Sequence, residues 1–229
     1  QGTDAVNLDQ LEAVAAAGET TSKYFQASGS ADSDAGALVE GENALAAGEA
    51  SNAIGDGAVA LGSGATAIGT NAAAVGFNAL ASGENASAGG FNAQATAANA
   101  SASGANAVAS GEYATANGAE SLASGEMSAA FGAGSVASGA GSTASGVLAE
   151  ASGEEAVAVG YFSTADGSGA TAVGSEAVAI GTTAASFGFA AEATGGYSTA
   201  VGGYAQASAF NTTALGSFAN ASGPNAVAL

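Results

Sequence analysis

Small and variable side chains alternate along most of this chain, inside units that repeat every seven residues. Counting in sevens from Gly41 to Gly223 gives 27 positions, of which 25 are glycine and two are Ala97 and Ala209. The fifth residue after each position is alanine, with Ser186 as the sole exception, and the third is again small. A disordered low-complexity chain has no reason to keep such a register.

Each unit, such as Gly62-Ser-Gly-Ala-Thr-Ala-Ile68, alternates with a period of two. That period predicts a short strand of about five residues, followed by a turn at the glycine. A coiled coil is disfavoured, because one glycine per heptad would cost a helix about 1 kcal/mol each time. Since the small side chains share one face, two sheets can approach closely. We therefore expect an all-β, flattened parallel solenoid with an interior of methyl groups.

A second period, twice as long as the first, lies inside it. The residues that precede the glycine positions form two alternating sets, and nine of the 14 in one set are Val, Leu or Phe. Only three of the 13 in the other set are large and apolar, and those three are isoleucines. The pattern predicts a fourteen-residue coil made of two units and two strands, with one sheet apolar on its outer face and the other facing water. At about 4.8 Å per coil, roughly 13 coils give a rod about 60 Å long.

The apolar set predicts self-association, because a row of large apolar side chains rarely stays exposed along a whole rod. The residues expected to face other copies are Leu61, Val75, Phe131, Val159, Val173, Phe187, Val201 and Leu215. Between about residues 83 and 117 this row turns polar, while Leu80, Val108, Leu122 and Val136 are apolar at a neighbouring position. Two interpretations remain: the middle is loosely packed, or the packing face rotates there.

The first forty residues follow another pattern. Residues 4–18 predict a short helix, in which Leu8, Leu11 and Ala15 share one face and Gly18 is a C-cap. Residues 19–40 are a polar connector with an aromatic strand around Tyr24. We thus divide the chain into a helical segment (1–18), a connector into the repeats (19–40) and the repeat domain (41–229).

Charge and composition remove whole classes of function. The net charge is −19 and Lys23 is the one basic residue, so nucleic acid and anionic membrane surfaces are disfavoured as partners. Without His or Cys, the usual catalytic triads, thiol nucleophiles and zinc sites cannot form. We expect no enzyme activity, no cofactor and no metal. The acids Asp56, Glu84, Glu112 and Glu126 lack the spacing of calcium-binding repeats.

Aromatic residues recur at the expected corners of the coil. These are Phe77, Phe91, Tyr113, Tyr161, Phe162, Tyr197, Tyr204, Phe210 and Phe218. Stacking from coil to coil is the favoured interpretation, and contact with a ligand is the alternative. The chain has no signal peptide and no apolar run long enough to cross a membrane, so a membrane anchor would lie outside this segment.

Two motifs resemble those of trimeric autotransporter adhesins with a YadA-like head. Asn52-Ala-Ile-Gly55, Val59-Ala-Leu-Gly62 and Ala177-Val-Ala-Ile-Gly181 resemble the head repeat, also called the haemagglutinin repeat, over residues 41–229. The resemblance to the neck motif rests on Asp4, Ala5, Val6, Asn7, Gln10 and Leu11. Residues 23–27 resemble the start of a head. The family's neck usually follows a head, so we expect a further head or stalk upstream, and a continuation past Leu229.

The resemblance implies a left-handed parallel β-roll, a homotrimer, and display on the bacterial outer membrane as a virulence factor. It also implies attachment to host cells and to matrix proteins such as collagen, fibronectin or laminin. A structural spacer, with adhesion carried by other domains, is the alternative function. An ice-binding rod is disfavoured because the water-facing row is mostly Ser rather than Thr, and a hexapeptide-repeat acyltransferase because the period is seven and His is absent.

Overall fold

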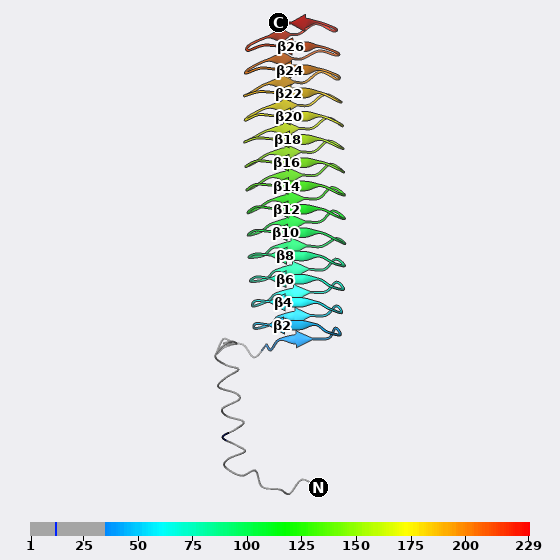
Figure 1. The fold of residues 1–229 in the computed structure, drawn as a ribbon, viewed down its shortest axis with the longest axis vertical. Coiled ribbons are helices and arrows are strands. Elements are labelled where there is room, and N and C mark those ends of the chain that lie inside the picture. The colour runs from blue at the N-terminus through cyan, green and yellow to red at the C-terminus, as the bar shows by residue number, and fades with distance from the viewer. Residues whose placement is uncertain (1–11, 13–34) are drawn as a thin grey trace. The chain divides into compact units, whose positions relative to one another are not determined.

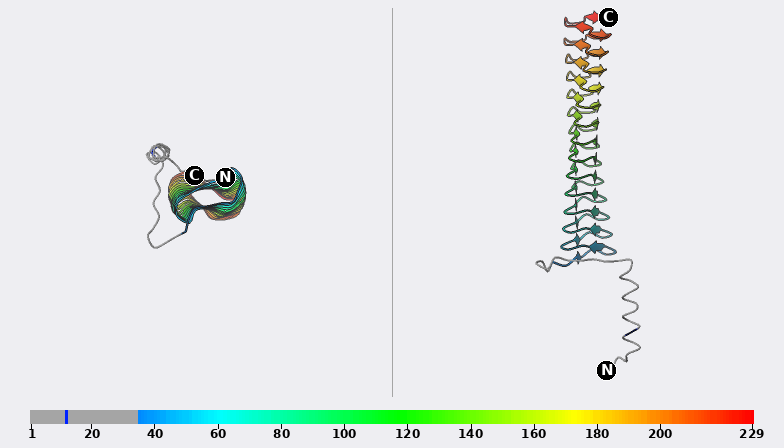
Figure 2. Two further views of the ribbon diagram at one scale, coloured as in Figure 1. Left: turned by 90° about the horizontal axis from the view of Figure 1, so that it is seen from below. Right: turned by 90° about the vertical axis from the view of Figure 1, so that its left-hand side faces the viewer.

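Two parallel β-sheets wind around a common axis in the repeat region. The computed structural model describes Glu12 and residues 35–229 of the chain, and residues 36–229 form one compact unit. In that unit, alternate strands belong to opposite sheets, so that the chain passes from one sheet to the other and back in every coil (Figure 1). Seen along the axis, the coils superpose as a flattened ring (Figure 2). The predicted parallel solenoid is confirmed.

We call the two sheets the odd and the even sheet, after the numbers of their strands. The odd sheet contains β1 (Leu38–Val39), β3 (Asn52–Ala53), β5 (Thr66–Ala67), β7 (Leu80–Ala81), β9 (Gln94–Ala95), β11 (Val108–Ala109), β13 (Leu122–Ala123), β15 (Val136–Ala137), β17 (Glu150–Ala151), β19 (Thr164–Ala165), β21 (Val178–Ala179), β23 (Glu192–Ala193), β25 (Gln206–Ala207) and β27 (Asn220–Ala221). The even sheet contains β2 (Leu45–Ala47), β4 (Val59–Leu61), β6 (Ala73–Val75), β8 (Ser87–Gly89), β10 (Ser101–Ser103), β12 (Thr115–Asn117), β14 (Ala129–Phe131), β16 (Thr143–Ser145), β18 (Val157–Val159), β20 (Thr171–Val173), β22 (Ala185–Phe187), β24 (Thr199–Val201), β26 (Thr213–Leu215) and β28 (Val227–Ala228).

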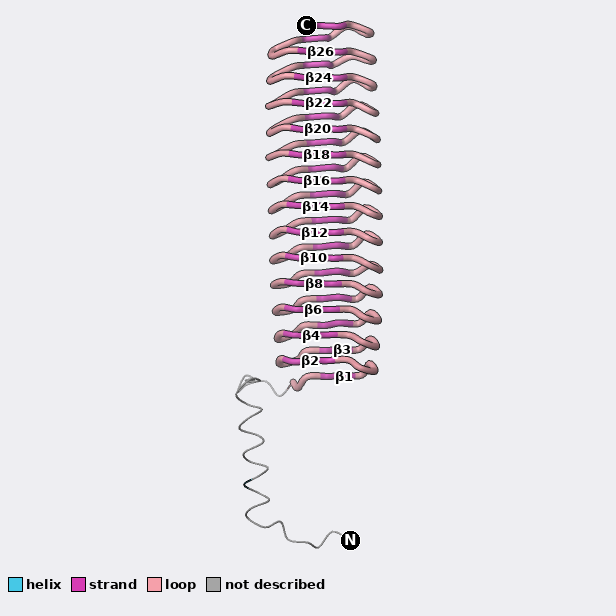
Figure 3. The backbone as a smooth tube through the Cα atoms, in the orientation of Figure 1, coloured by secondary structure: helices cyan, strands magenta, loops and turns pink. Residues whose placement is uncertain are grey.

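Both sheets keep the fourteen-residue register that the sequence predicts. Ala158 pairs with Ala172 in the even sheet, and Ala151 pairs with Ala165 in the odd sheet. The strands span two or three residues, so the predicted length of about five is wrong (Figure 3). The inward–outward alternation runs on into the turns, whereas the ladder of each strand ends where the chain bends at the glycine.

Alanine methyl groups fill the space between the sheets. The middle alanine of an even strand, such as Ala60 or Ala158, is 0% exposed, and so is the second residue of an odd strand, such as Ala67. The largest side chain that is fully buried is Thr212. Because no large side chain separates the sheets, the interior is thin, and coil-to-coil hydrogen bonding of the backbone has to supply much of the cohesion.

Almost every turn is closed by a backbone hydrogen bond from the fourth residue of the unit to its first; at Ala209 the Thr212 hydroxyl donates to the carbonyl instead, at 2.8 Å. The amide of Ala58 donates to the carbonyl of Gly55 at 3.0 Å, and the amide of Ala65 to that of Gly62 at 3.1 Å. Amides of the turn also bond the coil before, as Asn71 N does to Asp56 O at 2.8 Å. The turns are thus hydrogen-bonded within a coil and between coils, which fixes their side chains in columns along the roll.

The stacking predicted for equivalent residues of successive coils is present. The rings of Phe77 and Phe91 stack with centroids 5.6 Å apart and planes at 8°. Asn92 Nδ2 donates to the side-chain oxygen of Asn106 at 3.3 Å, and Asn85 to Asn99 at the same distance. Identical side chains therefore form short ladders on the turns, as the register requires.

The predicted N-terminal helix and most of the connector lie outside the described residues, apart from Glu12, which is helical. Strand β1 lies just before Gly41, where the glycine register begins, and Leu38 pairs with Asn52 of β3. The sheets thus extend slightly upstream of the repeat. In the part of the chain that the structure describes, no helix is long and apolar enough to cross a membrane.

Candidate interaction surfaces

The outer face of the even sheet carries all eight residues that we predicted to face other copies. Leu61 and Val75 are neighbours on β4 and β6, and Phe131 lies further along on β14. The longest run is an unbroken ladder of paired residues, in the order Val159, Val173, Phe187, Val201 and Leu215. In this single chain these side chains are half-buried or exposed, with Leu215 at 48%.

No strand of the even sheet, from β2 to β28, contains a charged residue. The odd sheet does, with Glu150 on β17 and Glu192 on β23. The even sheet is therefore a long surface without charge on a chain of net charge −19. A surface of this kind can be desolvated without burying an unpaired charge.

In the middle of the roll the apolar side chains move to the other sheet. Gly89, Ser103 and Asn117 interrupt the ladder on the even sheet. Over the same coils, the first residue of an odd strand is large and apolar at the paired Val108 and Leu122. Leu122 follows Asn117 across a single turn, so the two apolar rows flank the same edge of the roll. Apolar residues therefore lie on both sides of this edge, and the two interpretations, loose packing in the middle or a packing face that rotates, both remain predictions.

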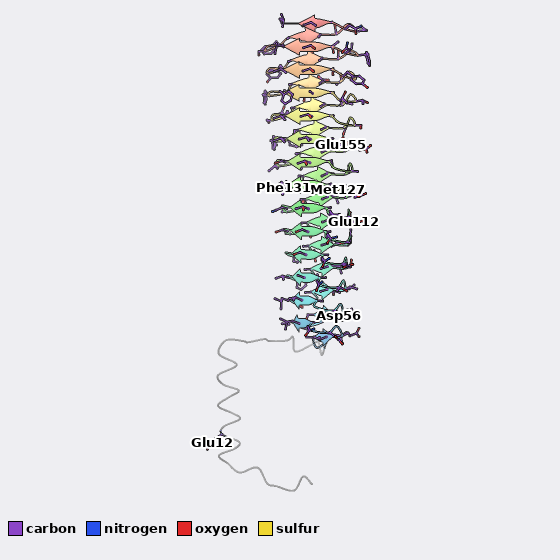
Figure 4. The ribbon with its side chains drawn as sticks, turned by 45° about the vertical axis from the view of Figure 1, so that its right-hand side comes forward. Glu12, Asp56, Glu112, Met127, Phe131 and Glu155 are labelled. Carbon is purple, nitrogen blue, oxygen red and sulfur yellow. The ribbon has the colours of Figure 1, made fainter. Side chains whose placement is uncertain are left out.

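The turns form two columns, which we name the acidic edge and the aromatic edge. The acidic edge consists of the turns that follow odd strands, at residues 41–43, 55–57 and the same place in every later coil up to 223–225. Its acids are Glu42, Asp56, Glu84, Glu112, Glu126, Glu154 and Glu155. In Figure 4, the labelled Asp56, Glu112, Met127 and Glu155 lie along one edge, with Phe131 towards the other. Residues 35–229 contain no Lys, Arg or His to neutralise these carboxylates.

The aromatic edge consists of the turns that follow even strands, at residues 48–50, 62–64 and the same place in every later coil up to 216–218. Phe77 and Phe91 stack in its first half, and Tyr161 meets Phe162 edge to face at 4.6 Å between centroids. Nearer the C-terminus, the Tyr204 ring contacts Phe189 at 5.2 Å and stacks on Phe218 at 5.1 Å. The predicted contact from coil to coil is present for Phe77 with Phe91, and Tyr204 makes it with Phe189 and Phe218. Tyr197 and Phe210 form a similar contact on the acidic edge, whereas Tyr161 and Phe162 meet within one turn.

Several large side chains on the two edges have a backbone conformation that large residues rarely adopt. The third residue of a turn is left-handed, with φ between 50° and 61° at the non-glycine positions from Ala50 to Phe218. Asparagine, which tolerates this conformation, is frequent there, as at Asn71 and Asn78. Phe162, Tyr204 and Phe218 occupy the same position with φ of 52°, 59° and 61°. The chain thus displays rings at positions where glycine or asparagine would be less strained.

A comparison with protein-family models identifies the repeats. The model of the YadA head domain repeat, which holds two copies, matches residues 40–65, 67–93, 95–121, 123–149, 151–177, 179–205 and 207–229. From residue 67 onward each match begins two coils after the last, so it agrees with the coil of the structure. The chain belongs to the YadA head family. A comparison with curated proteins gave no match.

Membership of the family confirms the resemblance and the fold: this is a YadA-like head of a trimeric autotransporter, built as a parallel β-roll. The family is one of non-enzymatic, surface-exposed adhesins. Among the described residues, no group of three or more His, Cys, Asp or Glu could hold a metal ion. The neck residues Asp4, Ala5, Val6, Asn7, Gln10 and Leu11 lie outside the described residues.

Sequence reasoning missed two features of the YadA-like head. It did not separate the two edges, and it overlooked Phe189, which contacts Tyr204 on the aromatic edge. Both could have been found by sorting the two residues after each glycine into alternating sets, as was done for the residue before it. That sorting gathers most acids on one edge and most rings on the other.

Proposed function

We propose that three copies of this chain pack their even sheets together, and that the resulting trimeric head attaches a bacterium to host cells. The targets are matrix proteins of the collagen, fibronectin or laminin class, and the head is displayed on the outer membrane. Val173, Phe187 and Val201 face the other copies in this arrangement, together with the other five residues of the apolar row. No catalytic role is part of the proposal.

The uncharged outer face of the even sheet carries this proposal. Copies of a chain with net charge −19 repel one another wherever their carboxylates approach. The even sheet is the face on which no strand has a charged residue, and on it Val159, Val173, Phe187, Val201 and Leu215 form a continuous apolar ladder. Burying that ladder against other copies removes it from water without bringing carboxylates together.

Three identical heads side by side would present every surface feature three times. Weak contacts to a repetitive matrix protein then combine through a high effective concentration. The two edges and the outer face of the odd sheet are the surfaces left for such contacts when the even sheets are covered. A rod that binds in this way needs no deep pocket.

Solution mass tests the assembly. We expect the chain to have the mass of three copies, and Val173→Asp with Val201→Asp to reduce it to one copy, because each protomer would bury two unpaired carboxylates. The matched control is Ile180→Asp with Ser208→Asp, which places the same charges at the same spacing on the odd sheet. The milder pair Val173→Ser and Val201→Ser covers the case in which the Asp pair unfolds. A monomeric wild-type chain contradicts the assembly.

Binding to immobilised collagen, fibronectin and laminin tests adhesion. The comparison protein is an unrelated β-solenoid of similar charge, which controls for electrostatic attachment. We expect the head to bind at least one matrix protein more tightly than the control does. Equal binding by both would make the head a structural spacer, with adhesion carried by other domains.

A further inference from the structure

One exposed carboxylate on the aromatic edge lies between two groups of aromatic rings. The amide of Glu176 bonds the carbonyl of Tyr161 at 2.8 Å, so Glu176 lies one coil after Tyr161 and Phe162. The amide of Ala190 in turn bonds the carbonyl of Ser175 at 2.9 Å, which places Phe189 and Ala190 one coil after Glu176. Along this edge the order is thus two rings, a carboxylate, and then three rings.

The rings on both sides are held in fixed arrangements and remain accessible. Tyr161 and Phe162 meet edge to face, with planes at 87°. On the far side of Glu176, Tyr204 contacts Phe189 edge to face and stacks on Phe218 with planes at 7°. The exposed fractions are 51% for Tyr161 and 48% for Tyr204. Large apolar side chains that are ordered by each other and still half exposed form a surface suited to recognition.

Glu176 has no side-chain partner within residues 35–229, which contain no cation. Its neighbours in the column of third turn residues are Phe162 one coil before and Ala190 one coil after, and Ser175 precedes it in the turn. Glu192, the next acid towards the C-terminus, differs because it accepts a hydrogen bond from Gln206 Nε2 at 3.3 Å. The Glu176 carboxylate is therefore exposed and unpaired between two aromatic groups.

We propose that this section of the aromatic edge binds an arginine side chain of a partner protein. A guanidinium is planar, can bond a carboxylate with two N–H groups and can stack on aromatic faces. Glu176 supplies the carboxylate, and Phe162 and Tyr204 supply rings on either side. The net charge of −19 attracts a cationic segment to the rod before these contacts form.

The backbone at the two rings supports a role in recognition. Phe162 and Tyr204 are in the left-handed conformation that Asn78 and Asn92 adopt at the equivalent places of earlier coils. Asparagine would relieve the strain of either ring, yet the chain keeps the rings exposed to solvent. Strain that folding does not require is expected where a side chain serves binding. The proposal names the chemistry of a partner for the adhesive head, but it does not depend on how many copies assemble.

Binding of a flexible peptide with four arginines spaced by Gly and Ser tests this proposal at low salt. The comparison peptides carry citrulline, a neutral isostere of arginine, or lysine at the same places. We expect the citrulline peptide not to bind measurably and the lysine peptide to bind about two- to fivefold more weakly than the arginine peptide. Equal binding of the citrulline or the lysine peptide overturns the proposal.

Variants of the full chain locate the site. Glu176→Gln, and separately Phe162→Asn with Tyr204→Asn, should each weaken binding of the arginine peptide about three- to tenfold. The asparagine variants should fold, since asparagine already occupies the same conformation elsewhere on the edge. The matched control is Glu154→Gln on the acidic edge, which removes the same charge where the equivalent residues of the adjoining coils, Ala140 and Ser168, are not aromatic.

Three results contradict the site. Equal weakening by Glu154→Gln and Glu176→Gln means that net charge alone attracts the peptide. Unchanged binding by the asparagine variants excludes the rings. A change of solution mass in those variants means that another copy of the chain covers this edge. A monomeric wild-type chain that still binds the peptide through Glu176 would refute the proposed trimer and leave this inference intact.

Discussion

The turns of the acidic and the aromatic edge share one hydrogen-bond pattern, but they differ in the reason why their first residue is glycine. On both edges the fourth residue bonds the first, as in Ala58 to Gly55 and Ala65 to Gly62. A Cβ at either of these two glycines would lie closer than 3 Å to a carbonyl of the next coil. On the aromatic edge the glycine also has a positive φ, between 126° and 146° from Gly48 to Gly216. On the acidic edge the first glycine is outside that range.

This difference explains at which positions of the repeat alanine replaces glycine. Ala97 and Ala209, which replace glycine, both open turns of the acidic edge. Crowding by a neighbouring carbonyl can be relieved by a small shift of the backbone, whereas the positive φ of the aromatic edge stays unfavourable for any residue with a Cβ. Glycine is thus required for space on one edge, and for both space and conformation on the other.

The largest expected effect comes from a methyl group at the two kinds of glycine. Gly146→Ala on the aromatic edge and Gly55→Ala on the acidic edge place the new Cβ equally close to a carbonyl oxygen of the next coil, at 2.3 Å. Both create crowding, worth about 1–3 kcal/mol. Gly146→Ala adds the strain of a φ of 144°, so it should lower the free energy of unfolding by about 1–2 kcal/mol more. Urea denaturation of both variants measures the difference, and equal losses would show that space alone selects glycine.

The interior of the roll can be predicted from the sequence better than its two edges can. Alanine two residues before every glycine position but one predicts the methyl core, and the two-unit register predicts the ladders of Phe77 with Phe91 and Asn92 with Asn106. The sequence shows that residue 146 is glycine, but it does not show that the φ of this glycine is positive. Ala97 and Ala209 were the available signal for a difference between the edges, because both replace the first glycine of turns on the same edge. Strand length was overestimated, since burial alternates further than the hydrogen-bonded ladder extends.

A smaller contrast is expected at the serines that replace the first buried alanine of a unit. On the aromatic edge, Ser135 Oγ donates to the carbonyl of Gly132 at 2.9 Å. On the acidic edge, the buried Oγ of Ser128 has no hydrogen-bond partner. Ser128→Ala should raise the free energy of unfolding by about 1 kcal/mol, because it removes an unsatisfied buried hydroxyl. Ser135→Ala should lower it by about 0.5–1 kcal/mol.

The same denaturation measurement applies to both serine variants. If Ser128→Ala is destabilising, the hydroxyl of Ser128 has a hydrogen-bond partner in solution. The buried serines of the two edges would then be equally well hydrogen-bonded. Ser198→Ala gives a check within the acidic edge, since Ser198 Oγ donates to Gly195 O at 2.6 Å and should behave like Ser135.

The left-handed third residue of the turn gives a further comparison. Met127 on the acidic edge has φ of 54° and is 60% exposed. Met127→Asn should raise the free energy of unfolding by about 1 kcal/mol, because asparagine tolerates this conformation. Phe162→Asn on the aromatic edge should gain less, since it also loses the contact with Tyr161. Equal gains in thermal or urea unfolding would mean that the ring contact contributes nothing to folding.

The smallest effect concerns the carboxylates that give the acidic edge its name. Glu126 lies one coil after Glu112, since the amide of Met127 bonds the Glu112 carbonyl at 2.8 Å. Like charges on adjacent coils repel, so Glu126→Gln should stabilise the roll by about 0.5 kcal/mol at low salt. The gain should vanish at about 1 M salt, where the screening length is about 3 Å. Glu120→Gln on the aromatic edge has Asn106 and Gly134 at the equivalent places of the adjoining coils, so it should change stability at neither salt concentration. A gain for Glu120→Gln as large as that for Glu126→Gln would show that total charge, and not its segregation to one edge, sets the electrostatic cost of the fold.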